Sequence, residues 1–188
     1  MGRGRARPVI HRRLTVLGLA LLALLAWACA TPPSTSRTAA PRDTLRPTGV
    51  TETATVLRVV DGDTIQVDRG QGRERVRYIG IDTPESVRPG HPVEWMGVEA
   101  AAANEALVAG REVVLERDVS ETDRFGRLLR YVWIADGAGW TLVNEALVAD
   151  GYAQVTTYPP DVKYADRFLA AQAEARERGV GLWASDPD

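Results

Sequence analysis

A tight β-hairpin is the strongest local signal in this sequence. Two runs rich in β-branched residues, 53–60 and 64–68, are separated only by Asp61-Gly62-Asp63. An Asp-Gly pair between such runs predicts two antiparallel strands joined by a short turn, because both residues tolerate the backbone conformation of that turn. The turn explains Asp61. Asp63 follows the turn, where its carboxylate either caps the turn or binds a metal ion.

The hairpin continues into a small domain that is mostly β. Residues 74–81 alternate charged and apolar side chains, which is typical of a half-buried strand. Further strands are predicted at 111–117 and 128–134, and helices at 94–110, 141–151 and 161–179. Thr141 is the expected N-cap of the second helix. Five strands in the order β-β-β-α-β-β, followed by two helices, predict an α+β fold, namely a five-stranded OB-like barrel with about three packed helices.

The N-terminal residues have the composition of an export signal. Residues 1–13 contain five arginines and no acidic residue, and residues 14–28 form an apolar run without charge. This run is shorter than the ~20 residues that usually span a bilayer. We therefore predict a signal peptide at 1–28, with an uncleaved anchor as the alternative, and expect an extracytoplasmic protein.

Cys29 is the only cysteine and directly follows the apolar run. Its position resembles that of the acylated cysteine in a bacterial lipoprotein signal, whereas Ala26-Trp27-Ala28 also fits the A-x-A pattern of ordinary cleavage. The sequence thus leaves open a lipid-anchored protein, with Cys29 as its first mature residue, and a secreted one. Residues 29–50 are rich in Pro, Thr, Ala and Ser, so we predict a flexible linker there and a folded domain at 51–185.

The charge balance argues against a broad surface for nucleic acid. The chain has 23 basic and 25 acidic residues, and without the five arginines of the signal the balance is 18 against 25. A net-acidic protein binds phosphate through a local cluster of basic side chains.

Three polar segments at predicted strand ends carry the candidate chemistry. They are Asp61 with Asp63, Arg77 with the DTPE segment at 82–85, and the ETDRFGR segment at 121–127. Side chains alternate faces along a regular strand, so the five-residue spacing of Arg77 and Asp82 does not by itself bring the two together.

Four motifs occur in the same order as in the staphylococcal nuclease (thermonuclease) family, which residues 53–183 resemble. They are DGDT (61–64), DTPE (82–85), TDRFGR (122–127) and VNEALVADGYA (143–153). The resemblance implies an SNase-like domain that hydrolyses the phosphodiester bonds of DNA and RNA with a bound Ca²⁺ and leaves 3′-phosphate ends.

The resemblance also implies roles for individual acidic residues. Ca²⁺ would be held by the carboxylates of Asp63 and Asp82 and by the main-chain carbonyl of Thr83, all of them the hard oxygen ligands that Ca²⁺ prefers. Glu85 matches the glutamate that takes a proton from the attacking water or orients that water.

Two arginines and one tyrosine complete the implied site. Arg77 and Arg127 match the arginines that grip the phosphate, for which the guanidinium fork is well suited. Tyr158 lies near the positions where the family stacks tyrosines on a base, although an ungapped register would place Thr157 and Pro159 there. Asp123 matches a family aspartate near the site, with a structural role expected.

Each of these residues also has an ordinary explanation as a turn, loop or solvent-exposed charge. The alternative function is therefore a non-catalytic nucleic-acid-binding OB-fold module at the cell surface, and a calcium-binding structural protein is a further one. We expect a monomer whose substrate is single-stranded or frayed DNA or RNA, because unpaired bases can enter a barrel groove.

Overall fold

The computed structural model describes residues 45–86, 90, 92–137 and 139–184. The predicted signal peptide, Cys29 and most of the predicted linker lie outside the described residues and stay predictions. The end of the predicted linker contacts the folded domain, because Leu45 packs against the core and the N–H groups of Thr48 and Gly49 donate to Glu116. Within the described part of the chain, no helix is both long and apolar enough to cross a membrane.

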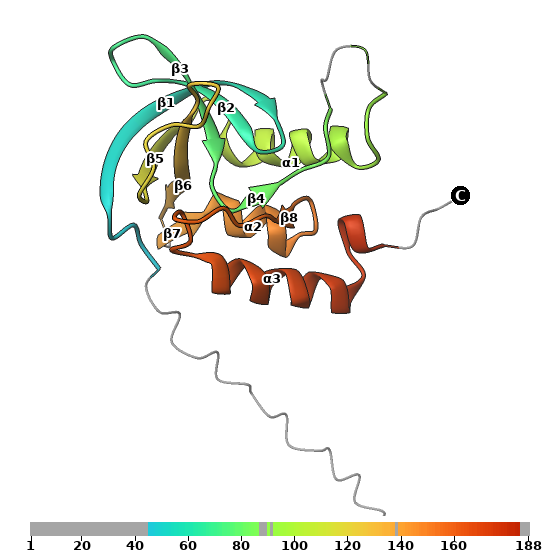
Figure 1. The fold of residues 1–188 in the computed structure, drawn as a ribbon. Helices are drawn as coiled ribbons and strands as arrows, with labels where there is room; N and C mark the ends of the chain where they lie inside the picture. The colour runs from blue at the N-terminus through green and yellow to red at the C-terminus, as the bar shows by residue number, and fades with distance from the viewer. Residues whose placement is uncertain (1–44, 87–89, 91, 138, 185–188) are drawn as a thin grey trace, which may run out of the picture. The chain divides into compact units, whose positions relative to one another are not determined.

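Five strands close into a ring (Figure 1). Strand β1 (Val50–Asp61) pairs with β2 (Thr64–Asp68) and with β5 (Glu112–Arg117), β2 also pairs with β3 (Arg73–Tyr78), and β5 pairs with β6 (Leu128–Asp136). These pairings are antiparallel, and a parallel pairing of β3 with β6 closes the ring. The ring confirms the predicted mostly β, OB-like fold.

Two short ladders extend this ring. β7 (Gly139–Leu142) forms a hairpin with β6, and β4 (Ile81–Asp82) pairs with β8 (Gln154–Val155). β4 follows β3 closely in the sequence, so its pairing with β8 fixes the segment that leaves the ring after Tyr78.

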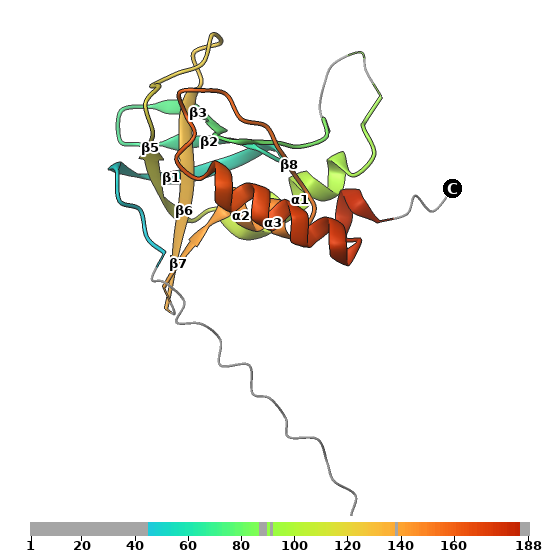
Figure 2. The same ribbon diagram turned by 60° about the horizontal axis from the view of Figure 1, so that its bottom comes forward.

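Three α-helices pack against the strands, as predicted. They are α1 (Gly97–Val108), α2 (Val143–Ala149) and α3 (Ala165–Arg178), and a short 3-10 helix η1 (Gly181–Trp183) follows. Figures 1 and 2 show α2 and α3 side by side. The N-cap prediction was wrong, because Thr141 belongs to β7, where it pairs with Ile134, and Leu142 takes the N-cap position instead.

The core fills the ring and extends to α2 and α3. Its strand residues follow the alternation expected of half-buried strands, with Ile65, Val76 and Leu115 fully buried. Leu147 of α2 and Phe168 of α3 are buried in the same cluster. The two helices therefore cover apolar surface that the strands alone would leave exposed.

A buried carboxylate, Glu116 of β5, lies at the edge of this core. The Glu116 side chain is 0% exposed. It accepts hydrogen bonds from Trp133 Nε1 at 2.8 Å and Tyr164 Oη at 2.9 Å, and it forms an ion pair with Lys163. It also accepts the N–H group of Gly49 at 2.7 Å. Glu116 thus connects the entry to β1 with β6 and with the start of α3.

The hydrogen bonds of Glu116 give a testable pH dependence. Burial alone would raise the pKa of Glu116, but hydrogen bonds from Lys163, Thr48, Tyr164 and Gly49 lower it below its usual 4.5. A carboxyl with a lower pKa in the folded state contributes stability above its unfolded pKa, and this stability is lost as the pH falls through the folded value. We expect Glu116→Gln to reduce the free energy of unfolding at pH 7 by about 2 kcal/mol.

Urea unfolding at neutral and acid pH tests this expectation. The difference between wild type and Glu116→Gln should shrink as the pH falls below about 4.5, the usual pKa of the group. The matched control is Glu145→Gln, which removes an exposed ion pair with Arg167 and should keep the wild-type pH dependence. A constant difference between wild type and Glu116→Gln at every pH would contradict the assignment.

Candidate active site

The Asp61-Gly62-Asp63 turn is fixed from two sides. The carboxylate of Asp61 is buried and accepts hydrogen bonds from Gly62 N–H at 2.9 Å and from Ser86 Oγ at 2.7 Å. Its main-chain carbonyl accepts Asn104 Nδ2 of α1 at 3.1 Å. Asp61 therefore stabilises the turn and attaches it to the segment after β4, which agrees with its assignment as a turn residue.

Asp63 follows this turn with its carboxylate directed inward. It is 2% exposed, and its Oδ1 and Oδ2 accept Thr64 Oγ1 and the N–H group of Thr83, both at 3.0 Å. A side chain at Gly62 would collide with Thr83, because a Cβ there would lie 2.7 Å from Thr83 Oγ1. Glycine at this position thus allows the DTPE segment to lie against the hairpin turn.

Arg77, at the end of β3, joins the two predicted metal-binding aspartates. Its guanidinium forms an ion pair with Asp63, and its Nη2 lies 2.5 Å from Asp82 Oδ1. Burial alone would lower the pKa of Arg77, but the two carboxylates raise it. Burial raises the pKa of Asp63, and the charge of Arg77 opposes that rise. The arginine thus neutralises carboxylates that the fold brings together.

The meeting of Arg77 and Asp82 has a backbone cause. β3 ends at Tyr78, and β4 begins at Ile81, so the two residues do not share a regular strand. Gly80 between them has φ of 80°, a left-handed conformation that favours glycine. This break in the alternation of faces places Arg77 and Asp82 on the same side.

Glu85 lies at the other end of the DTPE segment. Its N–H group donates to Glu94 Oε2 at 3.1 Å, and its carbonyl accepts Glu94 N–H at 3.0 Å. A Cβ on Gly97 would lie 2.7 Å from the same carbonyl, so the start of α1 packs directly on Glu85. The backbone of the predicted general base is therefore held, while its catalytic role stays a prediction.

A loop between β5 and β6 carries Arg127, and Asp123 organises that loop. Asp123 accepts the N–H groups of Phe125 and Arg127 at 2.8 and 3.0 Å, and Arg127 Nε lies 2.6 Å from its Oδ2. Burial alone would raise the pKa of Asp123, but these contacts lower it. The geometry gives Asp123 the structural role that the sequence analysis expected.

Phe125 extends from the same loop. Its ring is exposed, and the guanidinium carbons of Arg124 and Arg127 lie 4.7 and 5.5 Å from its centroid. These distances are within the range of cation–π interactions. The loop therefore presents an aromatic ring and two arginines together.

One pocket of about 470 Å³ lies between β3, β4 and this loop. Arg77, Arg127 and Tyr158 line it, and Ile79, Ile81 and Leu129 supply much of its apolar surface. Tyr158 is 71% exposed, so its ring is accessible from solvent. The structure thus brings the two predicted phosphate-binding arginines and the predicted stacking tyrosine to one pocket, which Asp63, Asp82 and Glu85 do not line among the described residues.

The predicted metal ligands match a hard cation in chemistry. Asp63 and Asp82 both contact one guanidinium, and Thr83 lies against Asp63, so two carboxylates and one main-chain carbonyl come from a small region. No three His, Cys, Asp or Glu side chains gather as a metal site within the described residues. These donors fit Ca²⁺, which completes its coordination with water and tolerates irregular geometry.

Two buried asparagines support the site and were missed in the sequence. Asn104 of α1 accepts Tyr78 Oη at 2.9 Å and donates to the Asp61 carbonyl. Asn144 of α2 donates to the Ile79 carbonyl at 2.9 Å. The available signal was an asparagine within a helix segment made mostly of apolar residues, since a buried amide needs a hydrogen-bond partner.

The chain is similar in sequence to one protein family and to several known nucleases. Residues 75–185 match the family described as "Staphylococcal nuclease homologue". The chain is 40% identical over 134 residues to the thermonuclease of Staphylococcus hyicus, which covers 71% of this chain and 77% of that protein. It is 39% identical over 132 residues to the thermonuclease of Staphylococcus intermedius, covering 70% and 76%. Endonuclease YncB of Bacillus subtilis (strain 168) is 37% identical over 132 residues, covering 69% and 61%.

The ion pair between Arg77 and Asp63 gives a stability prediction. Arg77→Met leaves the Asp63 carboxylate buried without its cation, so we expect the free energy of unfolding to fall by about 3 kcal/mol. Asp63→Asn in the same chain should recover most of that loss, because a neutral amide removes the buried charge.

Chemical denaturation at neutral pH with a chelator present measures both effects. Arg167→Met, in an exposed ion pair with Glu145, is the control and should cost less than about 1 kcal/mol. Additive losses in the double variant would contradict a coupled pair.

Proposed function

Since the chain belongs to the staphylococcal nuclease family, we propose that it is an exported, calcium-dependent nuclease that acts on DNA and RNA. The chain is a nuclease, an enzyme that hydrolyses phosphodiester bonds. The observation that carries the finer proposal is the position of Arg77, which lines the pocket with Arg127 and also contacts the carboxylates of Asp63 and Asp82.

The pocket supports a role in holding one phosphodiester group. Two guanidinium groups offer several N–H donors, and such forks match the oxygens of a phosphate. Negative charge builds on these oxygens as water attacks the phosphorus, so Arg77 and Arg127 would stabilise the transition state more than the bound substrate. The apolar surface of Ile79, Ile81 and Leu129 would accommodate the sugar and base beside the phosphate.

Asp63, Asp82 and the Thr83 carbonyl would hold the calcium ion. When bound, Ca²⁺ would supply positive charge to these carboxylates and to a phosphate oxygen. Arg77 also provides positive charge to the same two carboxylates. Burial raises the pKa of Asp63 and the charge of Arg77 opposes that rise, so nearby positive charge favours the ionised carboxylate.

Glu85 would take a proton from the attacking water or orient that water. The contacts of its backbone with Glu94 and Gly97 support this role, because a fixed backbone limits where its carboxylate can reach. The water oxygen bonds to phosphorus, the bond to the 5′ oxygen breaks, and that oxygen takes up a proton. The products would be a 3′-phosphate and a 5′-hydroxyl.

Other parts of the chain support proposals about the substrate and the location. We propose single-stranded or frayed nucleic acid as the substrate, because the exposed ring of Tyr158 at the pocket can stack only on a base that is not paired within a duplex. The apolar run at 14–28 supports export, either as a secreted monomer or with lipidated Cys29 as a membrane anchor. Outside the cytoplasm, calcium is abundant enough for a weak site.

Metal dependence and the Arg127 role share one assay. Purified protein should degrade denatured DNA with Ca²⁺ and lose that activity in a chelator. Arg127→Met should lower kcat/KM on the order of 100-fold or more, because removing one donor that stabilises the transition state costs that much. Arg167→Met, on the exposed face of α3, is the charge-matched control and should keep full activity. Equal activity with and without Ca²⁺ would rule out the metal, and absence of activity in both would favour a binding module.

The Tyr158 ring is tested separately with single-stranded oligonucleotides. Tyr158→Ala should raise KM roughly tenfold, because stacking on one base contributes about 1–3 kcal/mol. Tyr158→Phe keeps the aromatic face and should keep the wild-type KM. If both variants lose affinity equally, the hydroxyl rather than stacking explains the role of Tyr158.

A further inference from the structure

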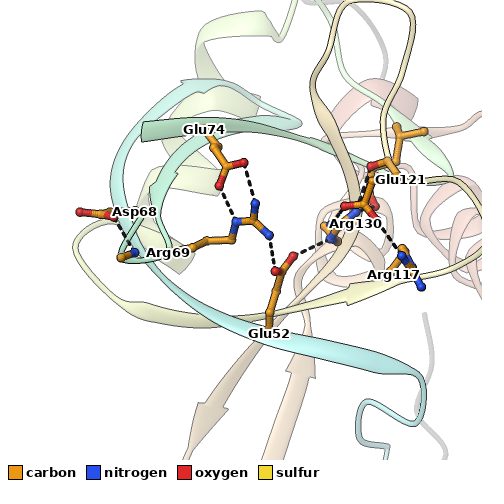
Figure 3. Close-up of polar contacts among 9 residues, drawn as sticks. Glu52, Asp68, Arg69, Glu74, Arg117, Glu121 and Arg130 are labelled. Carbon is orange, nitrogen blue, oxygen red and sulfur yellow. Dashed lines mark hydrogen bonds and ion pairs between the residues drawn. The ribbon is translucent and has the colours of Figure 1, made fainter. Parts of the chain in front are cut away.

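A buried arginine outside the proposed site, Arg130 of β6, contacts two carboxylates and two main-chain carbonyls. Its side chain is 3% exposed. Nε donates to Glu52 Oε1 at 3.0 Å, and Nη1 donates to the main-chain carbonyls of Glu121 and Leu129 at 3.0 and 2.9 Å. Nη2 forms an ion pair with the Glu121 carboxylate (Figure 3). Burying a cation costs free energy unless its charge and its N–H donors have partners. The Arg130 side chain keeps these partners only in this one conformation, so the contacts hold it there.

The side chain of Arg130 holds the base of the loop that carries Arg127. That loop is a small hairpin, because Leu129 N–H donates to the Glu121 carbonyl at 3.0 Å and Asp123 N–H donates to the Arg127 carbonyl at 2.9 Å. Nη1 of Arg130 contacts the carbonyls of Glu121 and Leu129, one from each arm. The guanidinium therefore ties together the two arms between which Arg127 lies.

The main chain of Arg130 is tied to the strand that carries Arg77. In the parallel β3–β6 ladder, Arg77 is the partner of Leu129, and Tyr78 is the partner of Arg130. The Arg130 carbonyl accepts the N–H group of Ile79 at 3.0 Å. One residue thus contacts both segments that supply the arginines of the pocket.

We propose that Arg130 is a positioning residue that fixes the separation of the Arg77 and Arg127 guanidinium groups across the pocket. This inference rests on the proposed function, in which both groups bind the same phosphate. Transition-state stabilisation by preorganised donors is sensitive to placement, and an error of about 1 Å in position can cost 100-fold in rate. Arg130 is not among the residues that line the pocket, so the effect of its side chain on turnover would pass through the placement of Arg127 relative to Arg77.

A second arginine of the same network serves as the matched control. Arg69 lies in the turn between β2 and β3 and forms ion pairs with Glu52 and Glu74, as Figure 3 shows. It shares the acceptor Glu52 with Arg130, but the partners of its guanidinium, Glu52 and Glu74, both lie outside the Arg127 loop. Arg69→Met therefore removes a network arginine of equal charge and size without touching the proposed path to the pocket.

Turnover of single-stranded DNA with Ca²⁺ tests the proposal. Arg130→Met should lower kcat at least tenfold with a smaller change in KM, because donor placement matters most as charge builds in the transition state. Arg130→Lys should restore little, since one ammonium cannot reach both carbonyls and both carboxylates. Arg69→Met should keep the wild-type kcat. An Arg130→Met chain that stays folded with wild-type kcat would overturn the proposal.

A double-variant cycle separates positioning from a general loss of structure. In an Arg127→Met background, under single-turnover conditions with excess enzyme, adding Arg130→Met should lower the rate less than twofold, because the group that it positions is gone. The same fold loss in both backgrounds would assign Arg130 a role that does not pass through Arg127, and would overturn the proposal.

Amide hydrogen exchange gives a readout that needs no activity. Arg130→Met should speed exchange at Leu129 N–H, whose acceptor is the Glu121 carbonyl that Arg130 Nη1 also contacts, and Arg69→Met should not. If Arg130→Met does not fold, Glu121→Gln weakens the same contact from its half-exposed side and should lower kcat in the same direction. Unchanged exchange and unchanged kcat in that variant would overturn the proposal. A wild-type protein without nuclease activity, by contrast, would overturn the proposed function, while the exchange result would still test the role of Arg130 in the loop.

Discussion

The contact of Arg77 with two carboxylates determines how the candidate site is built. Asp63 comes from the hairpin after β1 and Asp82 from the short strand β4, and both meet the guanidinium at the end of β3. Because Asp63 is buried, its charge requires a nearby cation, and Arg77 supplies it. The same arginine lines the pocket. A single residue thus connects the two carboxylates with the pocket proposed to bind phosphate, so a change of charge at Asp63 or Asp82 would alter the electrostatics of that pocket.

The glycines around this arginine have separate roles. Gly62 allows Thr83 to approach the hairpin turn. Gly80 adopts a left-handed backbone conformation that places the side chains of Arg77 and Asp82 on the same side. Neither glycine contributes a functional group, yet both determine where the functional groups lie. The site is therefore a consequence of backbone geometry at two turns as much as of the side chains that it contains.

The sequence predicted the fold better than the details of the site. β-Branched runs, turn residues and an Ala-rich helix reflect local preferences, so the strand order and the barrel could be predicted from them. The meeting of Arg77 and Asp82 could not, because regular alternation would separate them and only the break at Gly80 unites them. Glu116 and Arg130 also escaped prediction, since a charged residue in an alternating strand is expected to face solvent, and only long-range partners explain their burial.

Buried charge is used in two different ways in this domain. Glu116 accepts hydrogen bonds from neutral and cationic donors and has a lowered pKa, so it contributes stability at neutral pH. Arg130 instead directs most of its donors to one loop, and replacing it with an apolar residue of similar size need not lower stability much. A buried cation whose contacts converge on the arms of one functional loop is better explained by the precision that this loop needs than by stability alone. Arg77 completes this comparison, because its carboxylate partners Asp63 and Asp82 are the proposed metal ligands, whereas the carboxylate partners of Arg130, Glu52 and Glu121, have no proposed role in metal binding.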